Sequence, residues 1–193
     1  MGYKAPSLMT AEEPWEAYAL EVLAGILDGG QSARLTDRLV RGRELAASAS
    51  ASYGLTDRLQ TLVTLQGTPV QEVSVDELEA ALRTEIQRLQ KEPVSPEELD
   101  RVKAQVVASD VFERDSIFYQ AMQLGVMETV GLGHEELDRY VERIRAVTPE
   151  QVREVARRYL TEDRLTVAVL DPQPIEPGDN RSAPSGMGGR HVR

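Results

Sequence analysis

Apolar side chains follow a helical period through the first part of the chain. Residues 3–9 are extended in character, and Pro6 favours a strand edge or a bend there. The acidic pair before Pro14 opens a helix, because acidic residues suit a first helical turn and Pro is tolerated at its first position. Gly29 and Gly30 end this helix. Its apolar residues have the spacing of one buried stripe: Trp15, Tyr18, Ala19, Val22, Leu23 and Ile26.

The pattern then changes from a helical period to a period of two. Ser32 can cap a second helix with a single apolar stripe, formed by Leu35, Leu39 and Leu45. Residues 46–52 are all Ala or Ser, alternate from Ala47 onward and precede Tyr53, which predicts a strand with small side chains on both faces. Residues 59–65 also alternate and predict the neighbouring strand, joined to the first by a hairpin-like connection.

Helical periodicity returns at Ser74. Ser74 and Ser95 each begin a capping-box pattern, with an acidic residue three positions later that can bond back to the helix start. The helix that starts at Ser95 can extend to the glycines at residues 131–133, with an interruption near residues 115–116. The sequence therefore predicts two or three helices in this region.

Two more helices and a short strand complete the pattern. One helix spans residues 135–147, and Thr148 begins the last helix in capping-box form. Residues 165–170 form a short apolar run typical of a strand. The remainder is rich in Pro, Gly and Ser with few apolar residues, which predicts disorder. We therefore assign residues 1–171 to one domain and residues 172–193 to a disordered tail.

The order of these elements predicts the fold class. A strand is followed by two helices, two strands, four helices and a last strand. This order lacks the strict alternation of strand and helix that a parallel doubly wound sheet requires. It predicts an α+β fold, a mostly antiparallel sheet with helices packed on one face.

Composition excludes several classes of function. The 193 residues contain no Cys, so disulfides, thiol nucleophiles and thiolate metal sites are absent. The net charge of −10 disfavours binding to nucleic acid, because a polyanion would be repelled on average. No apolar run approaches the ~20 residues that a membrane-spanning helix needs. We expect neither a nucleic-acid partner nor a membrane span.

Four segments carry a resemblance to a known family: residues 3–7, 22–35, 94–103 and 147–172. The second contains Gly-Gly-Gln-Ser-Ala-Arg-Leu at a helix junction. In this order and spacing, the segments resemble the zinc-free C-terminal half of insulinase/pitrilysin-type zinc metallopeptidases, a family that includes the mitochondrial processing peptidases and their bacterial relatives. The resemblance implies a processing-peptidase-like metallohydrolase half, with the family's first strands lying before Tyr3.

The family's catalytic motif is missing from this sequence. The motif is an inverted His-x-x-Glu-His on one helix, where two imidazoles hold zinc and the Glu takes a proton from bound water. The two histidines here, His134 and His191, are 57 positions apart and cannot lie together on a helix. We interpret His134 as part of a solvated helix start. The sequence predicts no catalytic and no metal-ligating residue on this chain.

The resemblance also implies a substrate-binding Arg–Tyr pair, seven positions apart, in many second halves of the family. At the matching positions this chain has Val40 and Ala47, so the pair is missing. Arg41, Arg43 and Tyr53 are the residues that can substitute for it by geometry. Helix C-terminal charges and a strand aromatic explain the same three residues without any function.

The resemblance implies a non-catalytic half that forms one wall of a peptide-binding chamber. Its partners would be a homologous zinc-bearing domain or subunit and an unfolded peptide substrate, with zinc on the partner half and no cofactor on this chain. A homodimer of the fragment is a further possibility. The bacterial relatives favour the periplasm or cell envelope.

Two alternatives remain at this point. The first is a non-proteolytic scaffold or assembly subunit of the same fold, like the core subunits of respiratory bc1 complexes. The second is an unrelated α+β interaction domain that shares only helix-capping motifs with the family. Protease activity in a mixture with a zinc-bearing relative would favour the peptidase half over the first alternative. A helix-only structure would favour the second alternative.

Overall fold

The computed structural model describes residues 1–172 and contains a four-stranded antiparallel sheet. The strands are β1 (Gly2–Ala5), β2 (Ala46–Tyr53), β3 (Thr61–Pro69) and β4 (Leu165–Thr166). Their order across the sheet is β2-β3-β1-β4, so the central pair joins the N-terminal strand to the hairpin. β2 lies at one edge, and the two-residue β4 lies at the other.

All helices of the described chain cover one face of this sheet. On that face, Tyr3, Ala5, Val63 and Leu65 are buried in the core. The opposite face is open and mostly polar, since the alternate residues of β1, β2 and β3 point to it: Lys4, Ser48, Ser50, Ser52, Thr64 and Gln66. The predicted α+β architecture, antiparallel with helices on one face, is confirmed.

Three helices and a short helical segment lie next to the sheet. α1 (Pro14–Asp28) packs against β2, α2 (Val75–Lys91) against β3, and α6 (Pro149–Tyr159) against α1, α2 and β1. Between α1 and β2 the chain forms η1 (Thr36–Gly42), a π-helix. α1 is the central helix of the core, because most of its side chains are fully buried.

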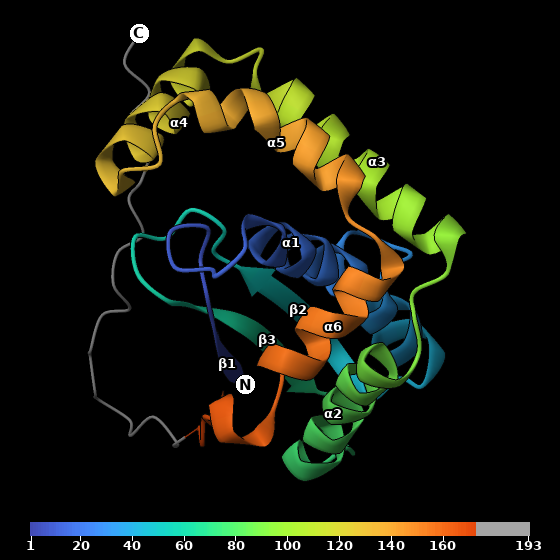
Figure 1. Ribbon diagram of the computed structural model, residues 1–193. Coiled ribbons are helices and arrows are strands. Elements are labelled where there is room, and N and C mark those ends of the chain that lie inside the picture. The colour runs from blue at the N-terminus through green and yellow to red at the C-terminus, as the bar shows by residue number, and fades with distance from the viewer. Residues whose placement is uncertain (173–193) are drawn as a thin grey trace, which may run out of the picture.

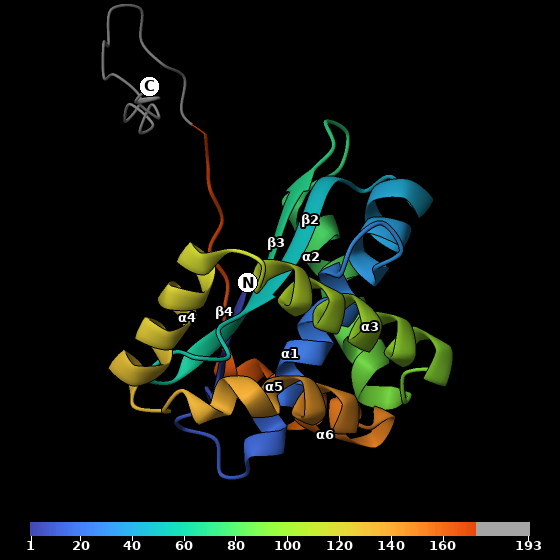
Figure 2. The same ribbon diagram turned by 90° about the horizontal axis from the view of Figure 1, so that it is seen from above.

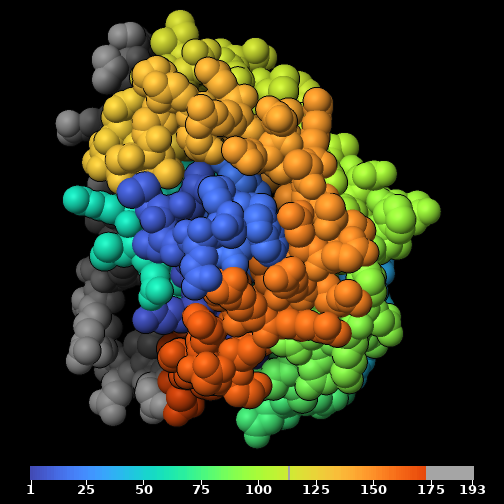
Figure 3. Space-filling view, viewed as in Figure 1, coloured from blue at the N-terminus to red at the C-terminus, as the bar shows by residue number. Residues whose placement is uncertain are grey.

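A second layer of helices arches over α1. It contains α3 (Pro96–Glu113), α4 (Ile117–Val130) and α5 (Glu135–Ala146). Figures 1 and 2 show this arch above α1, with α4 at its far end. The space-filling view shows α5 and α6 in orange beside the blue N-terminal segment (Figure 3). A 3-10 turn, η2 (Glu162–Arg164), then leads into β4.

The predicted helix starts at Ser74, Ser95 and Thr148 and the interruption of the long helix are confirmed, although the capping boxes predicted at Ser74 and Ser95 form only by half. Ser32 was wrong as a cap, because it lies in a turn and the N-cap position of η1 is Leu35. Ser74 and Ser95 accept hydrogen bonds from backbone N–H groups three residues later, and Thr148 forms a reciprocal box with Gln151. The interruption near residues 115–116 separates α3 from α4, and Ser116 caps the new helix. No helix among residues 1–172 is long and apolar enough to cross a membrane.

Three element boundaries predicted from the sequence were wrong. The second helix ends before Leu45, because Glu44 has a positive φ of 51° that turns the chain into β2. Leu59 is 73 % exposed in the hairpin loop, and β3 begins two residues later and extends to Pro69. The last strand has two residues instead of the six at 165–170, since β1 offers only Gly2 and Tyr3 opposite it. The predicted tail lies almost wholly outside the described residues.

Candidate functional site

The outer edge of β2 presents backbone groups away from the sheet. The N–H of Ala51 points outward and donates to Asp28 Oδ2 on α1 at 3.1 Å. Because alternate residues of a strand direct their backbone groups to the same side, the N–H of Ala49 also points outward. Within residues 1–172 it meets no acceptor there. This edge is therefore partly satisfied by α1 and partly available to another strand.

Two adjoining hollows lie next to this edge, beneath the arch of α3, α4 and α5. Their volumes are about 430 Å³ and 410 Å³. Both are lined by Glu21 of α1, Tyr53 of β2, and Val106 and Ser109 of α3. The larger extends to Tyr140 on α5, whereas the smaller follows the ends of α1 and β2. We call this combined space the edge hollow.

Glu21 is the most perturbed acidic group in the edge hollow. It lies on the solvent side of the buried helix α1 and is partly buried itself. Its carboxylate has no hydrogen bond or ion pair within the described part of the chain. Burial without a partner disfavours the charged form and raises the pKa of Glu21 to about 7.

Tyrosine side chains form the aromatic part of the same wall. Tyr53 donates from its hydroxyl to the Pro6 carbonyl at 2.6 Å, which fixes its ring at the end of β2. Tyr140 stacks at a tilt on Tyr18, with 6.2 Å between ring centroids. Burial, and then the nearby Glu21 carboxylate, raise the pKa of both Tyr53 and Tyr140 above its ordinary value. The two phenols therefore stay neutral at physiological pH.

The three substrate-binding candidates lie at opposite ends of β2. Tyr53 ends the strand inside the edge hollow, whereas Arg41 and Arg43 precede its start at the end of η1. Both arginines are exposed, and Arg41 pairs with Asp37 at 3.6 Å and with the Gln31 carbonyl. The fold brings Tyr53 to the edge hollow but does not bring the arginines to it. Their role in binding substrate stays a prediction.

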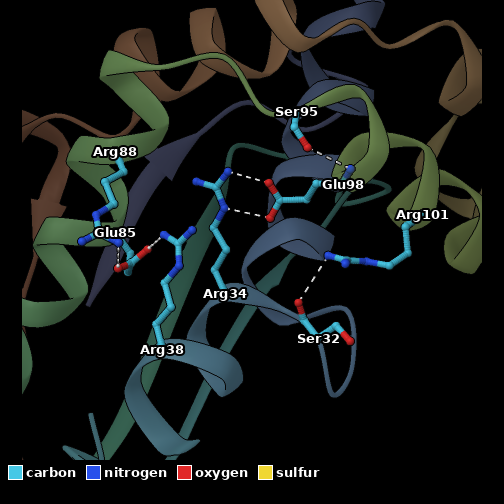
Figure 4. A network of polar contacts seen from close by, with 8 residues as sticks. All are labelled: Ser32, Arg34, Arg38, Glu85, Arg88, Ser95, Glu98 and Arg101. Atoms are coloured by element: carbon cyan, nitrogen blue, oxygen red, sulfur yellow. Dashed lines mark hydrogen bonds and ion pairs between the residues drawn. The ribbon is translucent and has the colours of Figure 1, made fainter. Parts of the chain in front are cut away.

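An ion pair that the sequence analysis did not identify joins two of the resembling segments. Arg34 forms two bonds to Glu98, of 2.9 and 2.6 Å, although the residues are 64 positions apart (Figure 4). Next to them, Arg38 and Arg88 pair with the buried Glu85 at 2.5 and 3.1 Å. Arg34 joins the segment before η1 to α3, and Arg38 joins η1 to α2, whereas Arg88 and Glu85 both lie on α2. Their side-chain types gave no signal of this pairing in the sequence.

Burial by itself would raise the pKa of the Glu98 carboxyl. The hydrogen bonds and charge of Arg34, with smaller effects from Arg38 and Arg101, hold this pKa below its ordinary value. The pair is largely buried on both sides, with side-chain exposures of 10 % for Arg34 and 17 % for Glu98. Glu98 is therefore a structural anion and not an acid–base group.

The residues that the structure describes do not fit a zinc site. α1 contains no His. His134 is exposed at the start of α5, where its Nδ1 lies 2.9 Å from Glu128, whose hydrogen bond raises the pKa of His134. Across residues 1–172, no three His, Asp or Glu side chains are grouped as metal ligands. His191 lies outside the described residues.

Comparison with known proteins identifies the family. Residues 1–106, just over half of the chain, match the model described as the peptidase M16 inactive domain. The chain belongs to this family. The resemblance inferred from the sequence is thereby confirmed, as is the assignment to the inactive class of domain. No curated protein matches the sequence.

Solved structures share the fold at low sequence identity. A protease from Helicobacter pylori matches 84 % of this chain with a TM-score of 0.76 and 20 % identity. The inactive peptidase domain from Bordetella parapertussis matches 91 %, with a TM-score of 0.69 and 18 % identity, over 92 % of its own length. Complex III from Candida albicans contains a chain that matches 82 %, with a TM-score of 0.69 and 17 % identity. This chain spans only 38 % of the Helicobacter and Candida proteins.

Proposed function

We propose that this M16 inactive domain forms one wall of a peptide-binding chamber, and that a homologous zinc-bearing half completes the chamber and cuts the peptide. Family membership and the absence of a His from α1 support the non-catalytic role that this proposal gives to the domain. The zinc would belong to the partner half, in the same polypeptide or in a second subunit.

The observation that carries the proposal is the outer edge of β2 next to the edge hollow. An unfolded peptide can add to a strand edge through main-chain hydrogen bonds, which require no particular sequence. The outward N–H of Ala49 would donate to such a peptide, and the hollow would receive side chains from it. The wall would therefore hold varied peptides in an extended conformation.

Replacing Ala49 by Pro tests this binding mode. The substitution removes one outward N–H and leaves the bonds between β2 and β3 in place, a position where Pro is tolerated in edge strands. The matched control is Ala49→Ser, which keeps the N–H. We would measure the fluorescence anisotropy of a labelled, unstructured 20-residue peptide with each protein.

We expect the wild type and Ala49→Ser to bind the peptide, and Ala49→Pro to bind it about tenfold more weakly, because a main-chain bond and strand contact are lost. Circular dichroism would show that the Pro variant retains the fold. Equal binding by all three proteins would reject the β2 edge as the contact. No binding of any peptide by the wild type would reject the wall function itself.

A scaffold without proteolysis is the second candidate. The similarity to a chain of complex III favours it, as does an apolar cluster where α3 meets α4. Four side chains of that cluster are between 54 % and 85 % exposed: Val111, Phe112, Ile117 and Phe118. Exposed apolar clusters of this kind are typical of protein-binding surfaces. Stable assembly with a zinc-bearing relative that shows no protease activity would favour this candidate.

A further inference from the structure

The ionisable groups that line the edge hollow are acidic or phenolic, and none is basic. Three carboxyl groups line its two parts: Glu21, Asp28 and Asp110. No Lys or Arg is among the residues that line either part. A lining with acidic and no basic side chains favours a cation over an anion.

Two of the three carboxyl groups already have partners. Asp28 accepts the N–H of Ala51, and Asp110 lies 3.0 Å from the guanidinium of Arg114. Glu21 alone of the three has no hydrogen bond or ion pair within residues 1–172. A partly buried charged carboxyl without a partner costs stability, so a group that pairs with it from outside would recover part of that energy.

Aromatic rings line the larger part of the hollow that Glu21 also lines. The hollow is lined by Tyr53, Tyr119 and Tyr140, from β2, α4 and α5. The faces of aromatic rings attract cations, and guanidinium groups also stack on them. Carboxylate and tyrosine together are therefore a suitable environment for an ammonium or guanidinium group with an aliphatic stem.

We propose that the edge hollow binds a Lys or Arg side chain of the bound peptide, with Glu21 as its ion-pair partner. The inference deepens the proposed function, on which it rests for the source of the side chain. In a peptide paired with β2, alternate side chains would point in the same direction as Ala51 and Tyr53. That direction leads over the smaller part of the hollow, toward Glu21.

The test uses free amino-acid derivatives, so that it does not depend on peptide binding. Isotope-labelled protein would be titrated with Nα-acetyl-arginine amide and, as a neutral control, with Nα-acetyl-glutamine amide, and followed by NMR. We expect the arginine derivative to shift the signals of Glu21, Tyr53 and Tyr140. The glutamine derivative is expected to leave them unchanged.

Glu21→Gln is the decisive variant, because it keeps the shape of the side chain and removes its charge. We expect it to weaken arginine binding at least tenfold at pH 7.5. Glu92→Gln, an exposed carboxyl distant from the hollow, is the matched control and is expected to bind as the wild type does. Lowering the pH to 5.5 protonates Glu21 and should weaken wild-type binding about tenfold or more, while Tyr53 and Tyr140 remain neutral.

The outcomes separate this inference from the proposed function. The cation site would be overturned if Glu21→Gln bound the arginine derivative as well as the wild type does, or if the glutamine derivative bound equally well. Either result would hold independently of the anisotropy measured with the labelled peptide. Arginine binding that depends on Glu21, in a protein that binds no peptide, would support the site and reject the chamber wall.

Discussion

Glu21 and Glu98 illustrate two opposite environments for a carboxyl group within one small protein. Glu98, in the first turn of α3, bonds to Arg34 and has a lowered pKa. The Arg34 guanidinium favours the charged form of Glu98 more than burial opposes it. Glu21 has no such partner within residues 1–172, and burial raises its pKa to about 7. The same residue type is thus a structural anion at one position and an available binding group at the other.

The free energy of unfolding should reveal the buried charge of Glu21. A pKa raised from 4.5 to about 7 gives stability that is complete below pH 4.5 and is lost as the pH rises through 7. We therefore expect Glu21→Gln to be more stable than the wild type at pH 8, by up to about 3 kcal/mol, and equally stable at pH 4.5. Urea unfolding at the two pH values measures this difference, and a difference that does not change with pH would contradict it.

At the scale of elements, one ion pair determines where α3 lies. Arg34, between α1 and η1, bonds to Glu98 in the first turn of α3. Arg101 on the next turn of α3 donates more weakly to the Ser32 carbonyl, at 3.3 Å. Figure 4 shows this junction at the first turns of α3. The same helix also forms one side of the edge hollow.

Replacing Arg34 by Met tests how much the Arg34–Glu98 ion pair contributes to the free energy of unfolding. We expect a loss of about 3 kcal/mol at pH 7, because the Glu98 carboxylate is left largely buried without its partner. The exposed Arg101→Met is the control and should cost less than about 1 kcal/mol. A lowered pKa contributes stability above pH 4.5 that is lost as the pH falls through the folded value. The difference between wild type and Arg34→Met, measured by urea unfolding, should therefore decrease in acid.

At the scale of the whole molecule, the chain has a sheet with one open polar face, one available edge and no set of zinc ligands among residues 1–172. In the proposed function, such a domain would hold a peptide and leave the activation of water to a zinc-bearing half. The proposal therefore requires a second half that supplies the metal.

Mixing this chain with a homologue that carries His-x-x-Glu-His tests that requirement. We expect cleavage of an unfolded peptide by the mixture and not by this chain alone. A chelator such as EDTA should abolish the cleavage, and added zinc should restore it. Cleavage by this chain without the homologue, in a chelator-sensitive way, would contradict the proposed division of roles.

Much of the fold could be predicted from the sequence, because its signals are local. Ser74, Ser95 and Thr148 cap their helices as the capping patterns predicted. The alternation of Ala and Ser predicted β2, which begins at Ala46 and includes Tyr53. The boundaries that were wrong, at Leu45, Leu59 and the last strand, depend on a positive φ, a loop path and a neighbouring strand. None of these three is visible in local periodicity.

The sequence by itself determined the fold class, the helix starts and the lack of a His pair for zinc, since these depend on residue type and short spacing. Only the tertiary structure decided that Arg34 meets Glu98, and that Glu21 shares a hollow with Tyr53 and Tyr140. The physical reason is that these contacts join residues far apart in the chain. The packing of one helix layer over another, which no local pattern specifies, brings them together and sets the pKa of each group.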